Sequence, residues 1–228
     1  MTLWCLSKGK VNDMHKAMVL DWRATPLFYK LMIVLYVIVM LAYGFYVSEL
    51  TVIIFGVFGF LIYSTNPFFA SDKEELYLLS QTLPIKRSQI VKGRFVNSIV
   101  MLVVGLVMGL AITPLVWFFA DFPRYGLREY TAIVVFSILL FALLHMFMYP
   151  LMFKYEYRKA SILGLYLPTG LIFVFYYVVM IPSDFAADFV SFALENLLLV
   201  HVGMGVLAVI FMLLSYIISM RLFCRRDF

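Results

Sequence analysis

The chain has 228 residues, of which 64% are hydrophobic and 14% charged, and its formal net charge is +5. A water-soluble domain of this length exposes more polar surface, so the composition excludes a soluble globular protein and indicates an integral membrane protein. The positive charge is explained by membrane topology and by attraction to anionic inner-leaflet lipid. We therefore expect a lipid bilayer, and no nucleic acid, as a partner.

The first predicted element is an amphipathic helix within residues 1–30. Its spacing suits a helix that lies along the inner membrane surface before the first span, with a tryptophan at headgroup depth. An interfacial anchor and a helix that contacts a partner protein both fit this pattern. The apolar face consists of Val11, Met14, Met18 and Trp22.

Six apolar stretches follow that are long enough to cross a bilayer, which takes roughly 20 helical residues. None of the charged residues has to lie in the middle of a span. The sequence therefore predicts an all-α membrane protein with six transmembrane helices in a single domain, residues 1–228. The predicted spans are residues 31–47, 50–69, 96–120, 130–153, 160–181 and 198–220.

The Lys and Arg residues decide the predicted orientation, because the cytoplasmic loops of membrane proteins carry the excess of these residues. With six spans, both termini lie on one side. Of the 18 Lys and Arg residues, only Arg124 and Arg128 fall on the other side. Both termini and residues 71–95 are therefore predicted to be cytoplasmic. Cys5 and Cys224 then face a reducing compartment, and no structural disulfide is expected.

Two features inside the spans have predicted roles in helix packing. Gly105 and Gly109 in the third span have the G-x-x-x-G spacing that lets helices approach closely, which predicts a packing site. His145 is the titratable candidate in the middle of the fourth span. We expect this lone histidine to pack or to form hydrogen bonds within the bundle, and a proton-carrying role is the alternative.

Residues 182–197, between the fifth and sixth spans, are predicted to form an outer amphipathic element. One edge of this short helix would rest in the outer membrane interface, with the carboxylates in water. The aromatic edge consists of Phe185, Phe189 and Phe192, and the acidic face of Asp184 and Asp188.

The sequence contains none of the motifs that would indicate catalysis in this chain. It has no G-x-x-x-x-G-K-[ST] phosphate loop, no G-x-S-x-G nucleophile motif and no cluster of His, Cys and Glu with metal-ligand spacing. We therefore expect a protein that is not an enzyme and that holds no cofactor or metal of its own. The spans also lack the carboxylates on which ion-coupled transporters depend.

The predicted cytoplasmic loop 71–95 is the most charge-dense segment and the main indication of function. Ser71 and Glu74 have the spacing of a capping box, which predicts a helix that begins at Ser71. An apolar stripe follows, and Pro84 ends the helix. Such a helix can dock in a groove of another protein, or it can lie on lipid beside basic residues. The stripe is Leu76, Leu79 and Leu83, and the basic residues are Lys86, Arg87, Lys92 and Arg94.

The stretch from Leu76 to Arg94 reads L-x-L-L-S-x-x-L-P-I-x-R-x-x-I-V-x-x-R and follows an acidic cluster. It resembles the first cytoplasmic loop of ABC-2 type permeases, the six-span membrane subunits of ABC exporters, although Thr82 stands where that family often has serine. The chain is also similar to this family in span count, topology and loop lengths. It looks most like the compact permeases that export antimicrobial or cytolytic peptides, as in phenol-soluble modulin exporters.

This resemblance implies that the loop holds a coupling helix, seated in a groove of a separate cytoplasmic ATPase that would bind ATP and Mg²⁺. It also implies a second permease copy, identical or different, and a multi-pass protein in the bacterial cell membrane. It implies no substrate-binding residues. The ATPase-coupling residues that it implies are Glu74, Glu75, Leu76, Leu78, Leu79, Leu83 and Pro84.

The sequence thus predicts the membrane permease of an ATP-driven exporter whose cargo is hydrophobic or amphipathic, such as peptides. The spans offer many Phe, Tyr and Met side chains and almost no charge, which suits loose apolar contact with cargo. Two alternatives remain open. One is a non-transporting immunity or scaffold protein that sequesters a peptide or recruits a partner. The other is an ion-coupled secondary transporter, which the missing intramembrane carboxylates disfavour.

Overall fold

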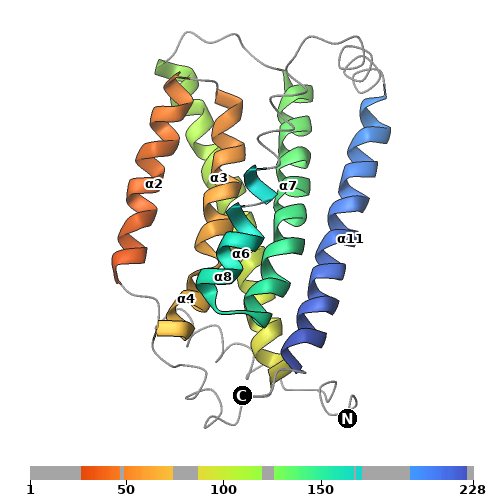
Figure 1. Ribbon diagram of the computed structural model, residues 1–228. Helices are drawn as coiled ribbons and strands as arrows, with labels where there is room; N and C mark the ends of the chain where they lie inside the picture. Colours follow the sequence, from red (N-terminus) through yellow and green to blue (C-terminus); the bar gives the residue numbers. More distant parts are fainter. Residues whose placement is uncertain are drawn as a thin grey trace.

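The computed structural model describes residues 27–46, 49–73, 87–119, 126–166, 168–170 and 196–224. All the regular elements within these residues are helices (Figure 1). The α-helices are α2 (Leu27–Tyr46), α3 (Glu49–Tyr63), α4 (Asn66–Lys73), α6 (Arg87–Phe119), α7 (Leu127–Lys154), α8 (Tyr157–Ser161) and α11 (Leu197–Cys224), and η2 (Ile162–Tyr166) is a short π-helix.

The long helices run side by side as a bundle, with α2 and α11 at opposite edges of the view in Figure 1. Two pairs have the most extensive contacts: α3 with α6, and α7 with α11. Contacts between α3 and α7 join the two pairs, while α2 packs mainly on α3. The short helices α4 and α8 lie together near one end of this bundle.

The described residues contain four helical stretches long and apolar enough to cross a membrane: Leu50–Phe69, Ser88–Phe119, Leu127–Lys154 and Leu197–Cys224. They correspond to the second, third, fourth and sixth predicted spans. The first predicted span coincides with α2, whose apolar part Ile33–Tyr46 is shorter. The predicted fifth span begins in α8 and η2, and most of it lies outside the described residues. The predicted N-terminal helix and most of the outer amphipathic element also lie outside them.

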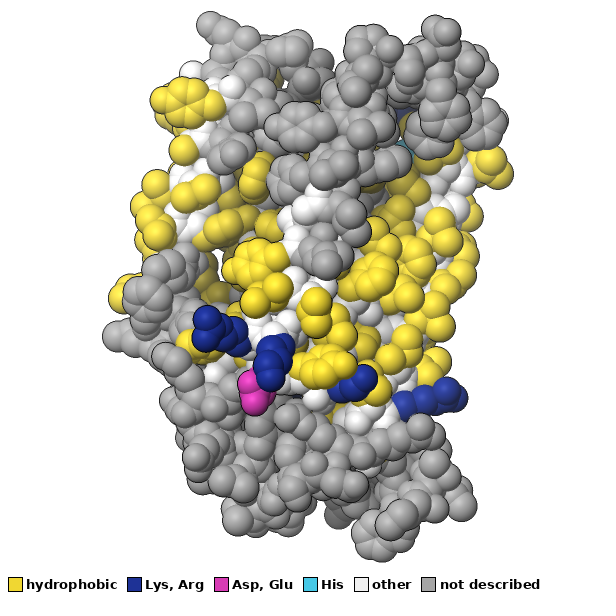
Figure 2. Space-filling view, viewed as in Figure 1, with side chains coloured by type: hydrophobic (Ala, Val, Ile, Leu, Met, Phe, Trp, Pro, Cys, Tyr) yellow, Lys and Arg dark blue, Asp and Glu magenta, His cyan; other side chains and the backbone are white. Residues whose placement is uncertain are grey.

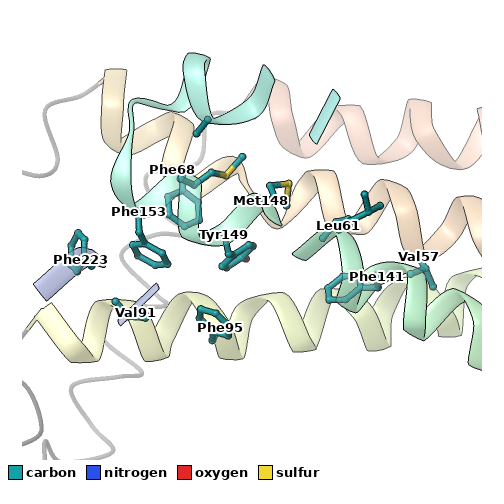
Figure 3. Close-up of a cluster of buried hydrophobic side chains, with 13 residues drawn as sticks. Val57, Leu61, Phe68, Val91, Phe95, Phe141, Met148, Tyr149, Phe153 and Phe223 are labelled. Atoms are coloured by element: carbon teal, nitrogen blue, oxygen red, sulfur yellow. The ribbon is translucent and has the colours of Figure 1, made fainter. Parts of the chain in front are cut away.

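The core of the bundle is rich in aromatic side chains at the end where α4 and α8 lie. Residues from α3, α4, α6, α7, α8 and α11 meet there in one buried cluster (Figure 3). Edge-to-face ring pairs inside it contribute beyond the burial of apolar area. The labelled members in Figure 3 are Val57, Leu61, Phe68, Val91, Phe95, Phe141, Met148, Tyr149, Phe153 and Phe223. A smaller cluster of Met40, Val52, Ile112 and Val116 joins α2, α3 and α6.

The G-x-x-x-G prediction is confirmed, because α3 and α6 touch through their backbones at these glycines. A Cβ atom at Gly105 would lie 2.9 Å from the Gly56 carbonyl oxygen, and one at Gly109 would lie 2.9 Å from Ile53 Cα. In the reverse direction, a Cβ at Gly56 would lie 2.7 Å from the Gly105 carbonyl oxygen. Only glycine allows this approach, as expected for helices that gain little hydrophobic energy from association in lipid.

We expect Gly105→Ala to destabilise the bundle, since the added methyl group would press on the backbone of α3. Overpacking of this kind costs roughly 1–3 kcal/mol, and the thermal unfolding temperature of the purified protein in detergent should fall. The matched control is Gly203→Ala on α11, where an added Cβ meets no described atom within 4 Å. Equal unfolding temperatures for the two variants would contradict the close contact.

Several hydroxyl groups inside the spans bond to the backbone of their own helix. Ser98 donates to the Phe95 carbonyl at 2.8 Å, Thr113 to the Gly109 carbonyl at 2.9 Å and Ser137 to the Ile133 carbonyl at 2.7 Å. Polar groups in a bilayer need an internal partner, and a carbonyl one turn back supplies it without help from another helix.

Most of the basic residues that the structure describes lie at the same end as the aromatic cluster, while Arg128 lies at the opposite end of α7. Figure 2 shows basic side chains along the lower border of a broad apolar surface. In the described part of α7, α8 and α11, the exposed basic residues near this end are Lys154, Arg158, Lys159 and Arg221. This grouping agrees with the predicted charge asymmetry, while the assignment of this end to the cytoplasm stays a prediction.

The expectation that the cysteines are reduced does not hold in the structure. Cys224, in the last turn of α11, is disulfide-bonded. The other cysteine of the chain, Cys5, lies outside the described residues. The expectation of reduced cysteines rested on the reduction of disulfides by thiols in the cytoplasm. That chemistry does not by itself exclude the bond at Cys224.

Candidate functional site

The predicted ATPase-coupling residues lie outside the described residues, in the segment 74–86. Glu74, Glu75, Leu76, Leu78, Leu79, Leu83 and Pro84 therefore remain sequence predictions. The structure describes the elements on either side of this segment. Helix α4 ends at Lys73 and α6 begins at Arg87, so these two helices hold the two ends of segment 74–86. The candidate site is the frame, meaning α4, α6 and the buried residues of the bundle that hold these two helices in place.

The capping box predicted at Ser71 is wrong. Helix α4 begins earlier, at Asn66, and Ser71 lies inside its second half. The predicted second span, residues 50–69, coincides with the membrane-length helical stretch Leu50–Phe69. The sequence did not predict that a turn divides this stretch into α3, which ends at Tyr63, and α4.

The turn between α3 and α4, called the corner here (residues 64–68), is stabilised by its own hydroxyl groups. Ser64 donates to the Leu61 carbonyl at 2.6 Å, and Thr65 donates to the Ile62 carbonyl at 2.7 Å. The same two carbonyls also accept the backbone N–H groups of Ser64 and Thr65, at 3.1 and 3.0 Å, so each hydroxyl adds a second bond to the turn. Pro67 then fits the first turn of α4, where its missing N–H has no cost. The run Ser-Thr-Asn-Pro was the sequence signal for this break.

Arg94 is the buried cation of the site, with only 3% of its surface exposed. It lies on α6 and reaches across to the corner, where its Nη2 donates to the Pro67 carbonyl at 3.4 Å. Its guanidinium carbon lies 4.2 Å from the centre of the Phe68 ring and 5.8 Å from that of Phe153. Arg94 therefore contacts α4 and α7 at once, through a hydrogen bond and through cation–π contacts.

The interpretation of Arg94 as part of a lipid-facing basic surface is therefore wrong. Lys92 remains exposed. Two residues along a helix are about 200° apart, so side chains at positions 92 and 94 point to nearly opposite sides. The loop sequence alone showed four basic residues and did not distinguish the one that turns inward.

Tyr149 of α7 makes the second link to the corner. Its hydroxyl lies 3.2 Å from the Ser64 carbonyl oxygen, 3.3 Å from Ser64 Oγ and 3.5 Å from the Arg94 carbonyl oxygen. Its ring packs edge-to-face on Phe68, with centroids 5.4 Å apart, and Phe153 packs on Phe68 at 4.9 Å (Figure 3). The corner is thus held between α6 and α7 by both polar and aromatic contacts.

Helix α8 also packs against the corner and α4. Tyr157 and Thr65 share a hydrogen bond of 3.4 Å between their hydroxyl oxygens, and Tyr157 packs edge-to-face on Phe69 at 5.3 Å. Burial raises the pKa of the Tyr157 phenol above its ordinary value, so the group stays neutral and can donate near physiological pH. Only Tyr155 and Glu156 separate α7 from α8, so α8 stays close to the end of α7, where it also contacts α4.

His145 lies deeper in the bundle and joins three helices, which confirms the prediction that it packs and forms hydrogen bonds. Its Nδ1 lies 3.0 Å from Ser215 Oγ on α11, and its Nε2 lies 3.0 Å from Ser98 Oγ on α6. The ring stacks on Tyr149 with centroids 3.7 Å apart. Because each serine hydroxyl also reaches a backbone carbonyl, a neutral imidazole in either tautomer satisfies every member of this network.

A family described as "ABC-2 family transporter protein" matches residues 21–224 of this sequence, which is nearly all of it. The chain belongs to the ABC-2 transporter family. No curated protein and no solved structure matches it. With its membrane-length helices, this ABC-2 protein is a multi-pass membrane protein, and the family assignment indicates the permease subunit of an ABC transporter.

For the ABC-2 permease, the family match covers nearly the whole chain and therefore includes the frame described above. The match spans both cytoplasmic loops that the sequence predicts, including segment 74–86. The corner, α6, α7 and α8 form a buried frame around the two ends of that segment. Sequence reasoning identified the segment, but it assigned Arg94 to a lipid-facing surface and missed Tyr149 and Thr65, which also hold the frame. Only the burial of these side chains distinguishes them from ordinary loop and span residues.

Proposed function

We propose that this chain is the permease subunit of an ATP-driven exporter in the bacterial cell membrane. Its cargo is hydrophobic or amphipathic, with peptides of the phenol-soluble modulin type as the favoured class. A separate cytoplasmic ATPase binds ATP and Mg²⁺ and docks on segment 74–86, and a second permease copy completes the transporter. The chain itself is not an enzyme.

The observation that carries this proposal is the family match together with the frame around segment 74–86. The helices on either side of the segment, α4 and α6, are tied by buried contacts to one another and to α7, as a region that receives mechanical work from a partner requires. The frame lies at the basic end of the described bundle, which the charge rule assigns to the cytoplasm. An ATPase would be found on that side.

The composition of the buried polar groups supports ATP-driven rather than ion-coupled transport. In the part of the chain that the structure describes, the buried polar or charged side chains are Ser, Thr, Asn, Gln, His and Arg, and none is a carboxylate. Proton and sodium pathways depend on ionisable groups within the membrane, usually in chains. Apolar and aromatic surface suits a peptide that is bound without a specific charge partner.

The test is transport by the purified permease and its co-purified ATPase in sealed proteoliposomes. A fluorophore-labelled amphipathic helical peptide should cross the membrane only when Mg²⁺ and ATP are supplied on the ATPase side. An imposed pH gradient without ATP should give no transport, and dissipating the gradient should not reduce ATP-driven transport. Transport driven by the gradient alone would refute the exporter. Peptide binding without any transport would support the immunity or scaffold alternative.

A further inference from the structure

Arg94 occupies a position that the proposed function does not yet explain. Helix α6 has 33 residues, which makes it about 50 Å long, while the apolar core of a bilayer is only about 30 Å thick. The N-terminal turns of α6 therefore extend past the core at the basic end. Arg94 lies about two turns from the start of α6, at this boundary. A cation there could reach water or headgroups with a different rotamer, yet it is turned into the bundle.

Burying a guanidinium is costly, so the contacts that it makes are informative. From α6, Arg94 donates a hydrogen bond to the Pro67 carbonyl and lies over the Phe68 ring, so it contacts the corner twice. It also makes a cation–π contact with Phe153 on α7. Tyr149 of α7 bonds to the corner at Ser64. The corner, α6 and α7 are therefore cross-linked at one place, which neither apolar packing nor a loop sequence would require.

The contact between Arg94 and Pro67 joins residues that lie close in sequence to segment 74–86, one before it and one after it. Pro67 lies about two helical turns before the segment, on α4, and Arg94 lies about two turns after it, on α6. The contact between them joins the helix that enters the segment to the helix that leaves it. While this contact holds, α4 cannot separate from α6, and the approach of Arg94 to Phe153 makes α7 follow them.

Resting on the function proposed above, we propose that Arg94 is a positioning residue for energy coupling, which makes the corner, α6 and α7 respond as one body to the ATPase. Lysine cannot replace it, because the ammonium group has no planar face to lie on Phe68 and no fork to reach Pro67 at the same time. Arg94 touches neither ATP nor any assigned cargo site. Its role is to prevent the motion of segment 74–86 from being lost within the permease.

The first test compares Arg94→Lys with Lys92→Gln, an exposed cation on the same helix, in proteoliposomes that contain the co-purified ATPase. For Arg94→Lys we expect the ATPase to stay bound and ATP hydrolysis to stay within about twofold. The amount of labelled amphipathic peptide exported per ATP should fall about tenfold, as when a desolvated cation–π contact is lost. Lys92→Gln should match the wild type. An unchanged export per ATP in Arg94→Lys would overturn the proposal.

If Arg94→Lys does not insert or fold, Phe68→Leu tests the same contact, because it keeps the guanidinium and removes the ring beneath it. The expected loss of export per ATP is the same, and an unchanged value again overturns the proposal. A purely structural role would lower the unfolding temperature and total activity together, without changing export per ATP. That result would also count against it.

A second readout needs no cargo, so it separates this inference from the proposed function. Spin labels at the exposed positions Ile62 on α3 and Lys154 on α7 report whether the corner and α7 stay together. We expect a narrow distance distribution in the wild type that broadens in Arg94→Lys, and equal widths would overturn the inference. If the wild type exports no labelled peptide with ATP, the proposed function fails, and the label distances still decide the role of Arg94.

Discussion

Leu79→Asp should abolish export and separate the permease from its ATPase, while the permease still inserts in the membrane. Leu79 is the central residue of the predicted stripe formed with Leu76 and Leu83. Burying a leucine side chain contributes roughly 1.5–3 kcal/mol, which alone is worth about 10- to 100-fold in binding. The aspartate adds the desolvation of a carboxylate without a partner. Co-purification of the ATPase and cargo-stimulated ATP hydrolysis measure the effect.

The matched control is Gln81→Asp, which adds the same charge two positions along, on the face opposite the predicted stripe. We expect Gln81→Asp to retain the ATPase. If Leu79→Asp also retained the ATPase and full cargo-stimulated hydrolysis, docking through this stripe would be excluded. The alternative in which the helix lies on lipid would then be favoured, and a loss of membrane contact by the segment without loss of ATPase would identify it.

His145→Leu should destabilise the bundle, while export should still follow ATP hydrolysis in the protein that remains folded. The substitution removes both hydrogen bonds that link α7 to Ser98 and Ser215, together with the stacking on Tyr149. Hydrogen bonds between membrane helices average about 0.6 kcal/mol and reach about 1.7. The two bonds together are therefore worth roughly 1–3 kcal/mol. Thermal unfolding in detergent measures the loss.

His145→Gln is the control for a proton-carrying role, because an amide can donate and accept hydrogen bonds but does not titrate in this range. A purely structural histidine predicts a smaller loss of stability than in His145→Leu and export per ATP close to that of the wild type. A proton carrier predicts complete loss of export in both variants, at any stability. The described neighbours of His145 are serines and aromatic rings, and none of them is a carboxylate or a second histidine that could pass the proton on.

The sequence predicted the parts of the fold that depend on average apolarity. The runs of apolar residues located α2, α7 and α11 to within about four residues and the C-terminal end of α6 to within one, although α6 begins nine residues before the predicted span. The Gly105 spacing located the contact of α6 with α3. Prediction failed at the corner, where Ser64 and Thr65 interrupt an apolar run. Hydropathy treats small hydroxyl residues as tolerable in a span, and it does not register that their bonds to Leu61 and Ile62 can end a helix.

The candidate site was predicted only in part, for a different physical reason. Segment 74–86 was conspicuous because its residue types are unusual between two spans. Arg94 and Tyr149 were not conspicuous, because their roles depend on which way a side chain turns from a helix end. That choice is made by the tertiary contacts with Phe68 and Pro67, which are distant in sequence. A single sequence gives helix positions but does not give the partner that each helix face meets.

The hydroxyl groups that bond within their own helices have a consequence for how such a protein changes shape. Ser98, Thr113 and Ser137 carry their acceptor carbonyls with them, so a helix that slides or rotates exposes no unsatisfied donor to lipid. Movement of α6 and α7 together against neighbouring helices therefore incurs little electrostatic penalty along most of their length. For α11 to move against them, the described polar contact that must break is that of His145 with Ser215. The barrier between conformations of this permease is then set by a few polar side chains and not by the length of the helices in contact.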